Sequence, residues 1–401
     1  MANIMDYMLW RGDLSLQAAP WCEVDTLICA TFCYIELDER AADENTILLK
    51  DIVPTLHLEE KTRDIYVNKR RSLALTMAES VRYRDVALHH FVNLVNENTQ
   101  FSAMIMDFPD GPRVVAFRGT DSTLAGWRED CCMSYETVPA QTLAQAYLHR
   151  TILTTEPGRP IVVCGHSKGG NLSTYAASHL PREAQDRLTS VYSFDGPGLD
   201  DATIASEGYS YVRSKLFSVI PQGSVVGLLM GFNPKFTVVH STASGIYQHD
   251  NFTWDLLGPH FAVMDSNDRP SQFINDTVHQ WLRECTPEQR RVFVKYLFDV
   301  LEYGNATTTY DLKANMTQTI ANMTEASRKL PPEDKKIFQQ MLMLMVSAGT
   351  GTAMSSVAEA ASGMLKKLET INLAGVKDAI TERLPHLPEK KRVIVIQEDN
   401  P

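Results

Sequence analysis

The sequence predicts an α/β fold with a mainly parallel sheet. Short apolar runs alternate with segments of helical periodicity, which favours strands joined by helical crossovers. Residues 160–164 (PIVVC) form a wholly apolar run of the kind found in central strands that are covered on both faces. A glycine-rich turn links this run to the next helical segment.

The first 99 residues are expected to form an N-terminal extension. Residues 24–37 carry apolar side chains at helical spacing and predict a buried helix. Residues 58–100 are more polar, and residues 72–96 have a helical pattern, which indicates a helical insertion.

Residues 100–270 are expected to form the core. The turn sequence Asp110-Gly111-Pro112 separates two strand candidates and predicts a hairpin. The remaining core elements alternate along the chain. The expected strands are 101–107, 113–117, 160–164, 191–194, 215–220 and 236–239, and the expected helices are 140–152 and 169–180.

The character of the sequence changes after about residue 270. Residues 272–283, 287–302 and 332–346 have helical periodicity, and only residues 392–396 resemble a strand. We therefore expect residues 271–401 to form a helical C-terminal region. Its methionine-rich stretch at 341–346 is more typical of core packing than of a lipid-binding face.

Composition narrows the classes of function. The 401-residue chain has a net charge of −11, which disfavours binding to nucleic acid. Its seven cysteines are odd in number and contain no C-x-x-C pair, so free thiols are expected. The N-terminus lacks a signal pattern and no run of 18 apolar residues exists, so we expect a cytoplasmic protein without a transmembrane segment.

Residues 165–169 (GHSKG) match the nucleophile-elbow pattern G-x-S-x-G between the apolar strand and the following helix. In such a turn Ser167 projects from the sheet as a nucleophile, and small flanking residues let strand and helix approach each other. The backbone N–H of Lys168, at the helix start, would face the oxyanion of an acyl-transfer reaction. The motif in this context predicts an α/β-hydrolase fold, with helices on both faces of the sheet.

A second motif, VVAFRGT at residues 114–120, precedes the elbow. Together the two motifs resemble those of the class 3, fungal-type triacylglycerol lipases. The resemblance covers roughly residues 100–260 and implies that Thr120 helps to form the oxyanion hole. A turn beside the elbow strand can aim an N–H and a hydroxyl at the same oxyanion. In the alternative interpretation, Arg118 and Thr120 merely tie down a loop.

A likeness to an uncharacterised bacterial family of lipase-like α/β-hydrolases covers more of the chain. It implies a fold and a reaction class, but no substrate. It rests on the segments MDYMLWRGDLS, EVDTLICATFCYIEL, GHSKGGNL, SFDGPG, IPQGSVVG and QHDNFTW.

A serine nucleophile needs a base, and in α/β-hydrolases the histidine comes last in the chain order of the triad. His249 lies in a loop shortly before a tryptophan, as in the lipase-like pattern, and is the predicted base. His240 ends a strand-like run, and His260 is a further candidate. His166 lies within the elbow, where packing is the better interpretation.

The sequence indicates the acid of the triad less clearly than it indicates the serine and the histidine. The class 3 lipases carry a carboxylate in the turn that corresponds to residues 220–225, and this turn has none. Asp195 follows an earlier strand and is the first candidate to orient His249. Ser224 is a weaker orienter through its hydroxyl, and Asp250 adjoins His249 too closely in sequence to reach its ring productively.

These residues predict a serine hydrolase that cleaves carboxylic esters through an acyl-enzyme. The substrate would be a small-molecule or lipid ester, and the chemistry needs no metal or organic cofactor. A thioesterase or acyltransferase would use the same site. A catalytically silent hydrolase fold that binds a partner is a different class, favoured by the missing carboxylate. The sequence predicts no oligomeric state.

Overall fold

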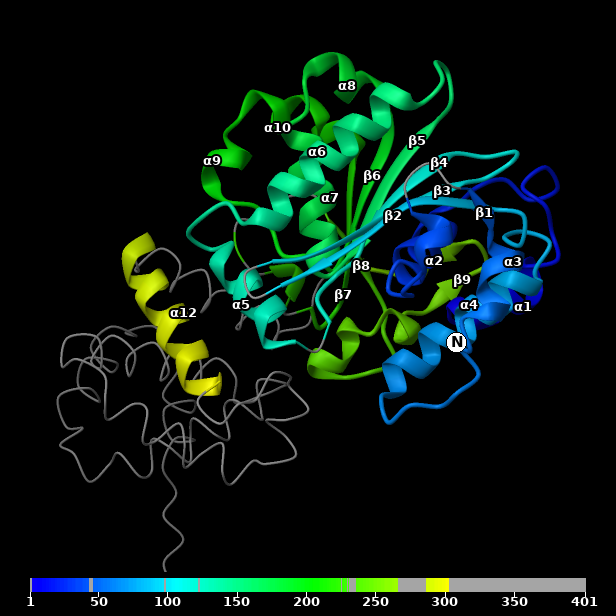
Figure 1. Cartoon of the computed structure of the whole chain (residues 1–401), viewed down its shortest axis with the longest axis horizontal. Helices are drawn as coiled ribbons and strands as arrows, with labels where there is room; N and C mark the ends of the chain where they lie inside the picture. The colour runs from blue at the N-terminus through cyan, green and yellow to red at the C-terminus, as the bar shows by residue number, and fades with distance from the viewer. Residues whose placement is uncertain are drawn as a thin grey trace, which may run out of the picture.

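The computed structural model describes residues 2–42, 46–96, 99–121, 123–224, 226–228, 230, 236–265 and 286–302 (Figure 1). The expected helices at 272–283 and 332–346 and the expected strand at 392–396 lie outside these residues.

The described residues contain a nine-stranded sheet in the order β1-β2-β3-β4-β5-β6-β7-β8-β11. Strands β4 to β8 pair in parallel, whereas the β1–β4 side and the β8–β11 edge are antiparallel. The strands are β1 (Ile47–Leu48), β2 (Ala87–Val95), β3 (Gln100–Asp107), β4 (Arg113–Phe117), β5 (Ile161–His166), β6 (Leu188–Phe194), β7 (Leu216–Pro221), β8 (Phe236–Val239) and β11 (Val263–Met264). A small separate sheet pairs β9 (Leu256–Leu257) with β10 (His260–Phe261).

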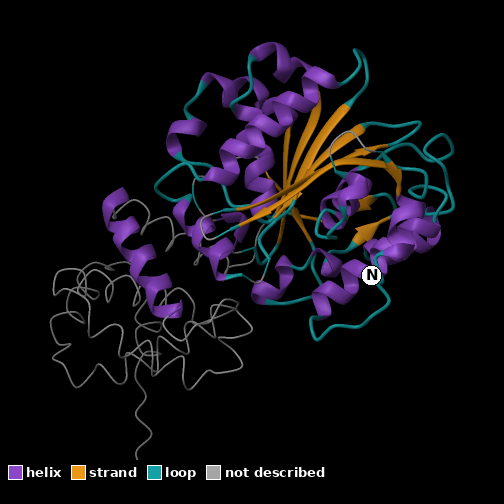
Figure 2. Ribbon diagram, viewed as in Figure 1, coloured by secondary structure: helices purple, strands orange, loops and turns teal. Residues whose placement is uncertain are grey.

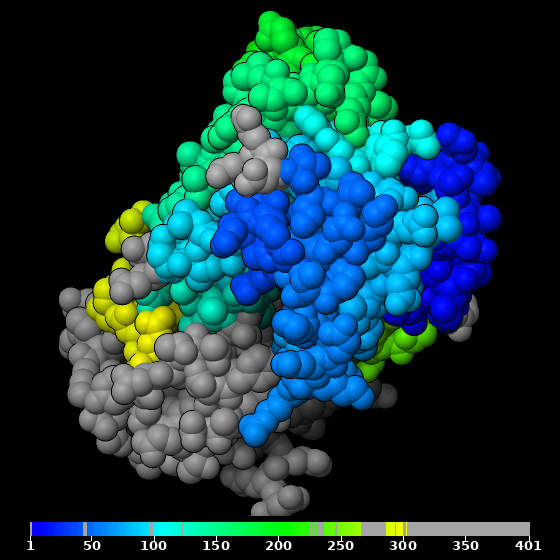
Figure 3. Space-filling view, turned by 45° about the vertical axis from the view of Figure 1, so that its right-hand side comes forward, coloured from blue at the N-terminus to red at the C-terminus, as the bar shows by residue number. Residues whose placement is uncertain are grey.

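Helices cover both faces of the large sheet (Figure 2). On one face lie α1 (Ile4–Arg11), α2 (Glu23–Phe32), α3 (Leu49–Ile52) and α4 (Ile65–Glu79). Figure 3 shows how much of this side of the molecule is covered by residues from the first hundred. The other face carries α6 (Pro139–Thr154), α7 (Lys168–Ser178), α8 (Arg182–Arg187), α9 (Asp201–Ile204) and α10 (Glu207–Val212). The chain therefore has the α/β-hydrolase fold that its sequence predicts.

Strand β5 is the centre of this arrangement because all six of its residues are buried and it pairs with β4 and β6. Its alternate side chains enter the two cores: Val162 and Cys164 belong to the α2 side, and Ile161 and Val163 to the α6–α7 side. The expected hairpin and the expected core strands and helices are confirmed, with ends that differ by a few residues.

The helix expected over residues 72–96 is wrong in its second half. Helix α4 ends at Glu79, and residues 87–95 form β2, which pairs with β3. A bulge between His89 and Val92, with His90 at φ 53°, interrupts the alternation by which a strand is recognised. Because β1 and β2 belong to the large sheet, the expected division at residue 99 falls between two paired strands.

Helix α12 (Pro287–Leu301) forms within the expected segment 287–302. It packs beside α5 (Leu124–Cys132), where Arg128 pairs with Glu302 at 2.7 Å. Among the helices of the described part of the chain, none combines the length and the apolar character that a membrane crossing requires.

Candidate active site

Ser167 lies between β5 and α7 in a backbone conformation that L-residues rarely adopt, with φ 60° and ψ −133°. The turn is tight, since a Cβ on Gly165 would lie 2.2 Å from Gly169 and a Cβ on Gly169 would lie 2.1 Å from the Phe117 oxygen. The Ser167 N–H donates to the carbonyl oxygen of Phe194 on β6 at 2.9 Å. The local structure is thus the strained strand-to-helix turn of a nucleophile elbow.

The turn after β4 lies directly against the elbow. A Cβ on Gly119 would stand 2.9 Å from the Cβ of Ser167, so only a glycine fits between the two turns. The next residue, Thr120, donates its hydroxyl proton to Asp130 Oδ2 at 2.5 Å. Because that proton is used, the candidate oxyanion donor at Thr120 is its backbone N–H.

The side chain of Lys168 is buried although its backbone begins α7. Its Nζ pairs with the buried carboxylate of Glu129, donates to the Gln100 carbonyl oxygen at 3.1 Å and lies 3.5 Å from Asp130 Oδ1. Burial raises the pKa of Asp130, and the Lys168 ammonium opposes that shift. Asp130 therefore joins Lys168 to Thr120, the two residues predicted to supply oxyanion donors.

The loop that carries His249 is fixed by its neighbours. Trp254 Nε1 donates to the Gln248 carbonyl oxygen at 2.7 Å, and the Gln248 side chain accepts from the Gly223 N–H at 2.8 Å. Asn251 Nδ2 donates to Thr31 on α2 at 2.7 Å. These bonds anchor the loop both to the sheet and to the N-terminal helices.

His166 supports the same loop. Its Nε2 donates to the His249 carbonyl oxygen at 2.8 Å, and its ring lies against that of His249 with centroids 4.5 Å apart. With Nε2 protonated, Nδ1 accepts from the Tyr34 hydroxyl at 3.0 Å. Burial lowers the pKa of His166 well below its ordinary value, so the ring stays neutral. His166 therefore does more than pack, because it bonds directly to the residue predicted to be the base.

Asp195 and His249 meet although 54 residues separate them. His249 Nδ1 donates to Asp195 Oδ2 at 2.6 Å, and the carboxylate is fully buried. Asp195 Oδ1 accepts from Ser224 Oγ at 2.5 Å and from the Gly227 N–H at 3.1 Å. The two candidates therefore form one chain of hydrogen bonds, in which Ser224 bonds to the Asp195 carboxylate and that carboxylate bonds to the His249 imidazole.

The other candidates have different partners. His240 pairs through Nδ1 with the buried Asp255 at 2.5 Å, and the exposed His260 lies 3.6 Å from Glu23. Asp250 pairs with Lys69 of α4 at 2.6 Å. Tyr34, Glu129 and Asp130 were not predicted from the sequence. The one signal for the two carboxylates was the lysine directly after the nucleophile, which needs charged partners once it is buried.

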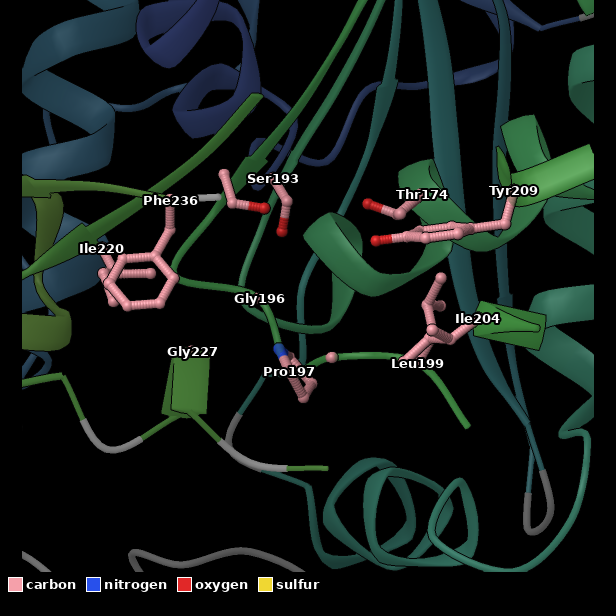
Figure 4. Close-up of a pocket in the computed structure, with 12 residues that line it drawn as sticks. Thr174, Ser193, Gly196, Pro197, Leu199, Ile204, Tyr209, Ile220, Gly227 and Phe236 are labelled. Atoms are coloured by element: carbon pink, nitrogen blue, oxygen red, sulfur yellow. The ribbon is translucent and has the colours of Figure 1, made fainter. Parts of the chain in front are cut away.

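A small cavity lies behind the Asp195 loop (Figure 4). Tyr209 and Thr174 point into it from one side, and Phe236 and Ile220 lie opposite. The Tyr209 hydroxyl is buried and has no hydrogen-bond partner among the described residues. The lining residues are Thr174, Ser193, Gly196, Pro197, Gly198, Leu199, Ile204, Tyr209, Ser218, Ile220, Gly227 and Phe236. Ser167 and His249 are not among the described residues that line this cavity.

The sheet, the elbow and the lipase-like motifs define a protein of the lipase-type hydrolase class. Within that class, the chain belongs to the Mbeg1-like family, which matches residues 77–299.

Solved structures with detectable similarity include M37 lipase, at 15% identity and a TM-score of 0.32, covering 51% of this chain and 67% of that one. Another is the lipase from Rhizopus microsporus var. chinensis, at 15% identity and a TM-score of 0.31, covering 52% and 83%. No curated protein matches the chain.

Proposed function

We propose that the protein is a serine hydrolase that cleaves carboxylic esters through an acyl-enzyme on Ser167. The observation that carries this proposal is the hydrogen bond between His249 and Asp195. The loop that carries His249 is in turn bonded to His166, which belongs to the elbow. With Nδ1 of His249 donating to the carboxylate, its Nε2 has the lone pair that a general base requires.

In the proposed reaction, Ser167 Oγ attacks the ester carbonyl while His249 takes its proton. The carbon–oxygen bond of the ester then breaks, and the leaving alcohol receives that proton. Water, deprotonated by His249, hydrolyses the acyl-enzyme and restores the serine. The backbone N–H groups of Lys168 and Thr120 would hold the oxyanion, aided by the N-terminus of α7.

A thioesterase or an acyltransferase would use the same groups, because both pass through an acylated serine. Product analysis separates these activities. Incubation with matched oxygen esters and thioesters, with and without an alcohol acceptor, measures which bond is cleaved and whether the acyl group goes to water. We propose an ester as substrate because the family and the similar lipase structures point to that class.

The rival of a different class is a catalytically silent binding protein. A fluorophosphonate probe labels only an activated serine, so we expect the wild type to be labelled and Ser167→Ala to remain unlabelled. Ser173→Ala is the matched control, because Ser173 lies in the same helix and donates to the Gly169 carbonyl oxygen at 2.8 Å. An unlabelled wild type, with the fold intact by circular dichroism, would favour the silent protein.

We also propose a reducing, cytoplasmic location. The cysteines Cys22, Cys29, Cys33, Cys131, Cys132 and Cys164 are free thiols, as expected where disulfides do not persist.

A further inference from the structure

Two arginine side chains lie near Ser167 but take no part in the proposed chemistry. Arg70, on α4, stacks with its guanidinium carbon 3.6 Å from the centre of the Tyr34 ring. Arg118 follows β4 and is only 5% exposed. Burial raises the pKa of Tyr34 to about 12, and the charges of both arginines oppose that shift, so both guanidinium groups lie within electrostatic reach of the ring.

Tyr34 brings these charges close to the nucleophile. A Cβ on Gly119 would stand 2.0 Å from the Tyr34 hydroxyl and 2.9 Å from the Cβ of Ser167, so both groups lie close to Gly119. The Tyr34 hydroxyl also bonds to His166 at 3.0 Å. Arg70 therefore approaches the elbow by way of the Tyr34 ring on whose face it stacks.

The positive charges at this place are incompletely neutralised. Within the part of the chain that the structure describes, Arg118 Nε and Nη2 are buried without a hydrogen-bond partner. Arg118 Nη1 is 3.8 Å from Glu36, a carboxylate that is 72% exposed. Over the described residues, Arg70 makes no ion pair with a carboxylate, whereas Lys69 beside it pairs with Asp250. Buried donors are normally satisfied, so the unsatisfied guanidinium of Arg118, which precedes the glycine packed against Ser167, indicates that an anion completes the site.

The position of α4 indicates which part of a substrate would carry the anion. His249 must protonate the leaving alcohol, so the alcohol lies on the side of His249. Lys69 is bonded to Asp250, the residue after His249, at 2.6 Å. Arg70 itself stacks on Tyr34, Tyr34 bonds to His166, and the His166 ring packs against His249. These contacts place Arg70 on the His249 side, which is the alcohol side of the bond to be cleaved.

We propose that Arg70, backed by the buried charge of Arg118, forms a subsite for an anionic group on the alcohol portion of the ester. The preferred substrates would carry a phosphate or a carboxylate on that alcohol. The anion makes a charge-assisted hydrogen bond with Arg70 and takes no part in bond breaking. This inference rests on the proposed ester hydrolysis at Ser167.

The test compares matched esters of octanoic acid. Octanoylglycerol phosphate against octanoylglycerol tests a phosphate, and octanoyloxybutanoate against pentyl octanoate tests a carboxylate. We expect wild type to show kcat/KM at least about tenfold higher for the anionic member of one pair, mainly through KM, as one charged hydrogen bond provides. Arg70→Gln should abolish this preference, and Arg70→Lys should retain part of it.

Arg71→Gln is the matched control, since Arg71 is the next residue of α4 and donates to the Glu60 carbonyl oxygen. It should keep the preference. Equal kcat/KM within both pairs, or a preference that survives in Arg70→Gln, overturns the subsite. Calorimetric binding of octanoylglycerol phosphate and octanoyloxybutanoate to Ser167→Ala, with and without Arg70→Gln, tests it without turnover. Binding of either that depends on Arg70 supports the subsite even if fluorophosphonate labelling fails, and binding of neither contradicts it.

Discussion

At Asp195, three donors converge on one buried carboxylate: the imidazole of His249, the hydroxyl of Ser224 and the N–H of Gly227. The residue adopts a positive φ of 47°, which an aspartate tolerates better than most residues. This geometry lets the carboxylate leave the end of β6 and reach across to the loop that carries His249. Ser224, the neutral candidate to orient His249, and Asp195, the charged one, thus belong to one chain of hydrogen bonds.

This chain predicts an order of effects on catalysis. Asp195→Asn should lower kcat by roughly 10⁴-fold, because an amide cannot hold the imidazole tautomer or stabilise its charged form. Ser224→Ala should cost only about tenfold, since it removes one donor from a carboxylate that keeps the other two. Steady-state hydrolysis of a nitrophenyl ester measures both. A larger loss in Ser224→Ala than in Asp195→Asn would contradict the assignment.

The sequence could predict the nucleophile but not this chain of bonds. Ser167 is marked by local spacing, because a strand, a G-x-S-x-G turn and a helix are contiguous. Asp195, Ser224 and His249 come from three separate loops, and only the packing of β6, β7 and β8 side by side sets their distances. That is why the sequence left Asp195 and Ser224 as alternatives.

At the scale of elements, helix α5 is coupled to the elbow through the buried pair of Glu129 and Lys168. Glu129 also accepts from the N–H groups of Gln100 on β3 and Ala140 on α6. One carboxylate therefore joins a strand, two helices and the residue after the nucleophile. A sequence shows only a lysine and a glutamate 39 residues apart, so this pairing could not be predicted.

We expect Glu129→Gln to lower the free energy of unfolding by about 3 kcal/mol, because the buried Lys168 ammonium keeps only Asp130, at 3.5 Å, as a charged partner. Lys50→Met should cost less than about 1 kcal/mol, since its pair with Asp85 is exposed to solvent. Urea unfolding measures both changes. Equal losses in the two variants would show that the buried pair stabilises the fold no more than the exposed pair does.

The wrong prediction of a helix over the second half of residues 72–96 has a physical cause. The sequence predicts a helix where β2 forms, because the bulge in β2 breaks the two-residue period by which a strand is recognised. Strand β8 pairs without such an interruption, and its expected bounds match the structure. In β5 the irregularity falls between its first two residues, and its wholly apolar run still identifies the strand to within two residues.

For the whole molecule, the N-terminal segments are integral to the core. The buried Asp25 on α2 pairs with Arg82 at 2.6 Å and accepts from the hydroxyls of Tyr7 on α1 and Tyr83. Helices α1 and α2 pack in the same hydrophobic core cluster as residues of β3, β4 and β5. We therefore expect the first 99 residues and the catalytic core to unfold together.

Asp25→Ala tests this expectation, because it leaves the Arg82 guanidinium buried and unpaired. The variant should lose about 3–5 kcal/mol of unfolding free energy in one transition, followed both by circular dichroism and by fluorophosphonate labelling. Asp38→Ala is the control, since its bond to Arg40 lies at the surface and should cost less than about 1 kcal/mol. Two separated transitions in Asp25→Ala would show an N-terminal unit that unfolds independently.

The central claim is that an acyl group passes through Ser167, and trapping that intermediate tests it most directly. The protein is quenched in acid during turnover of nitrophenyl octanoate, and its peptides are analysed by mass spectrometry. We predict an octanoyl group on Ser167, with more of it in Asp195→Asn if deacylation slows more than acylation, and none at this position in Ser167→Ala. Turnover with no acyl adduct in either protein, or an adduct on another residue that persists in Ser167→Ala, would contradict the account.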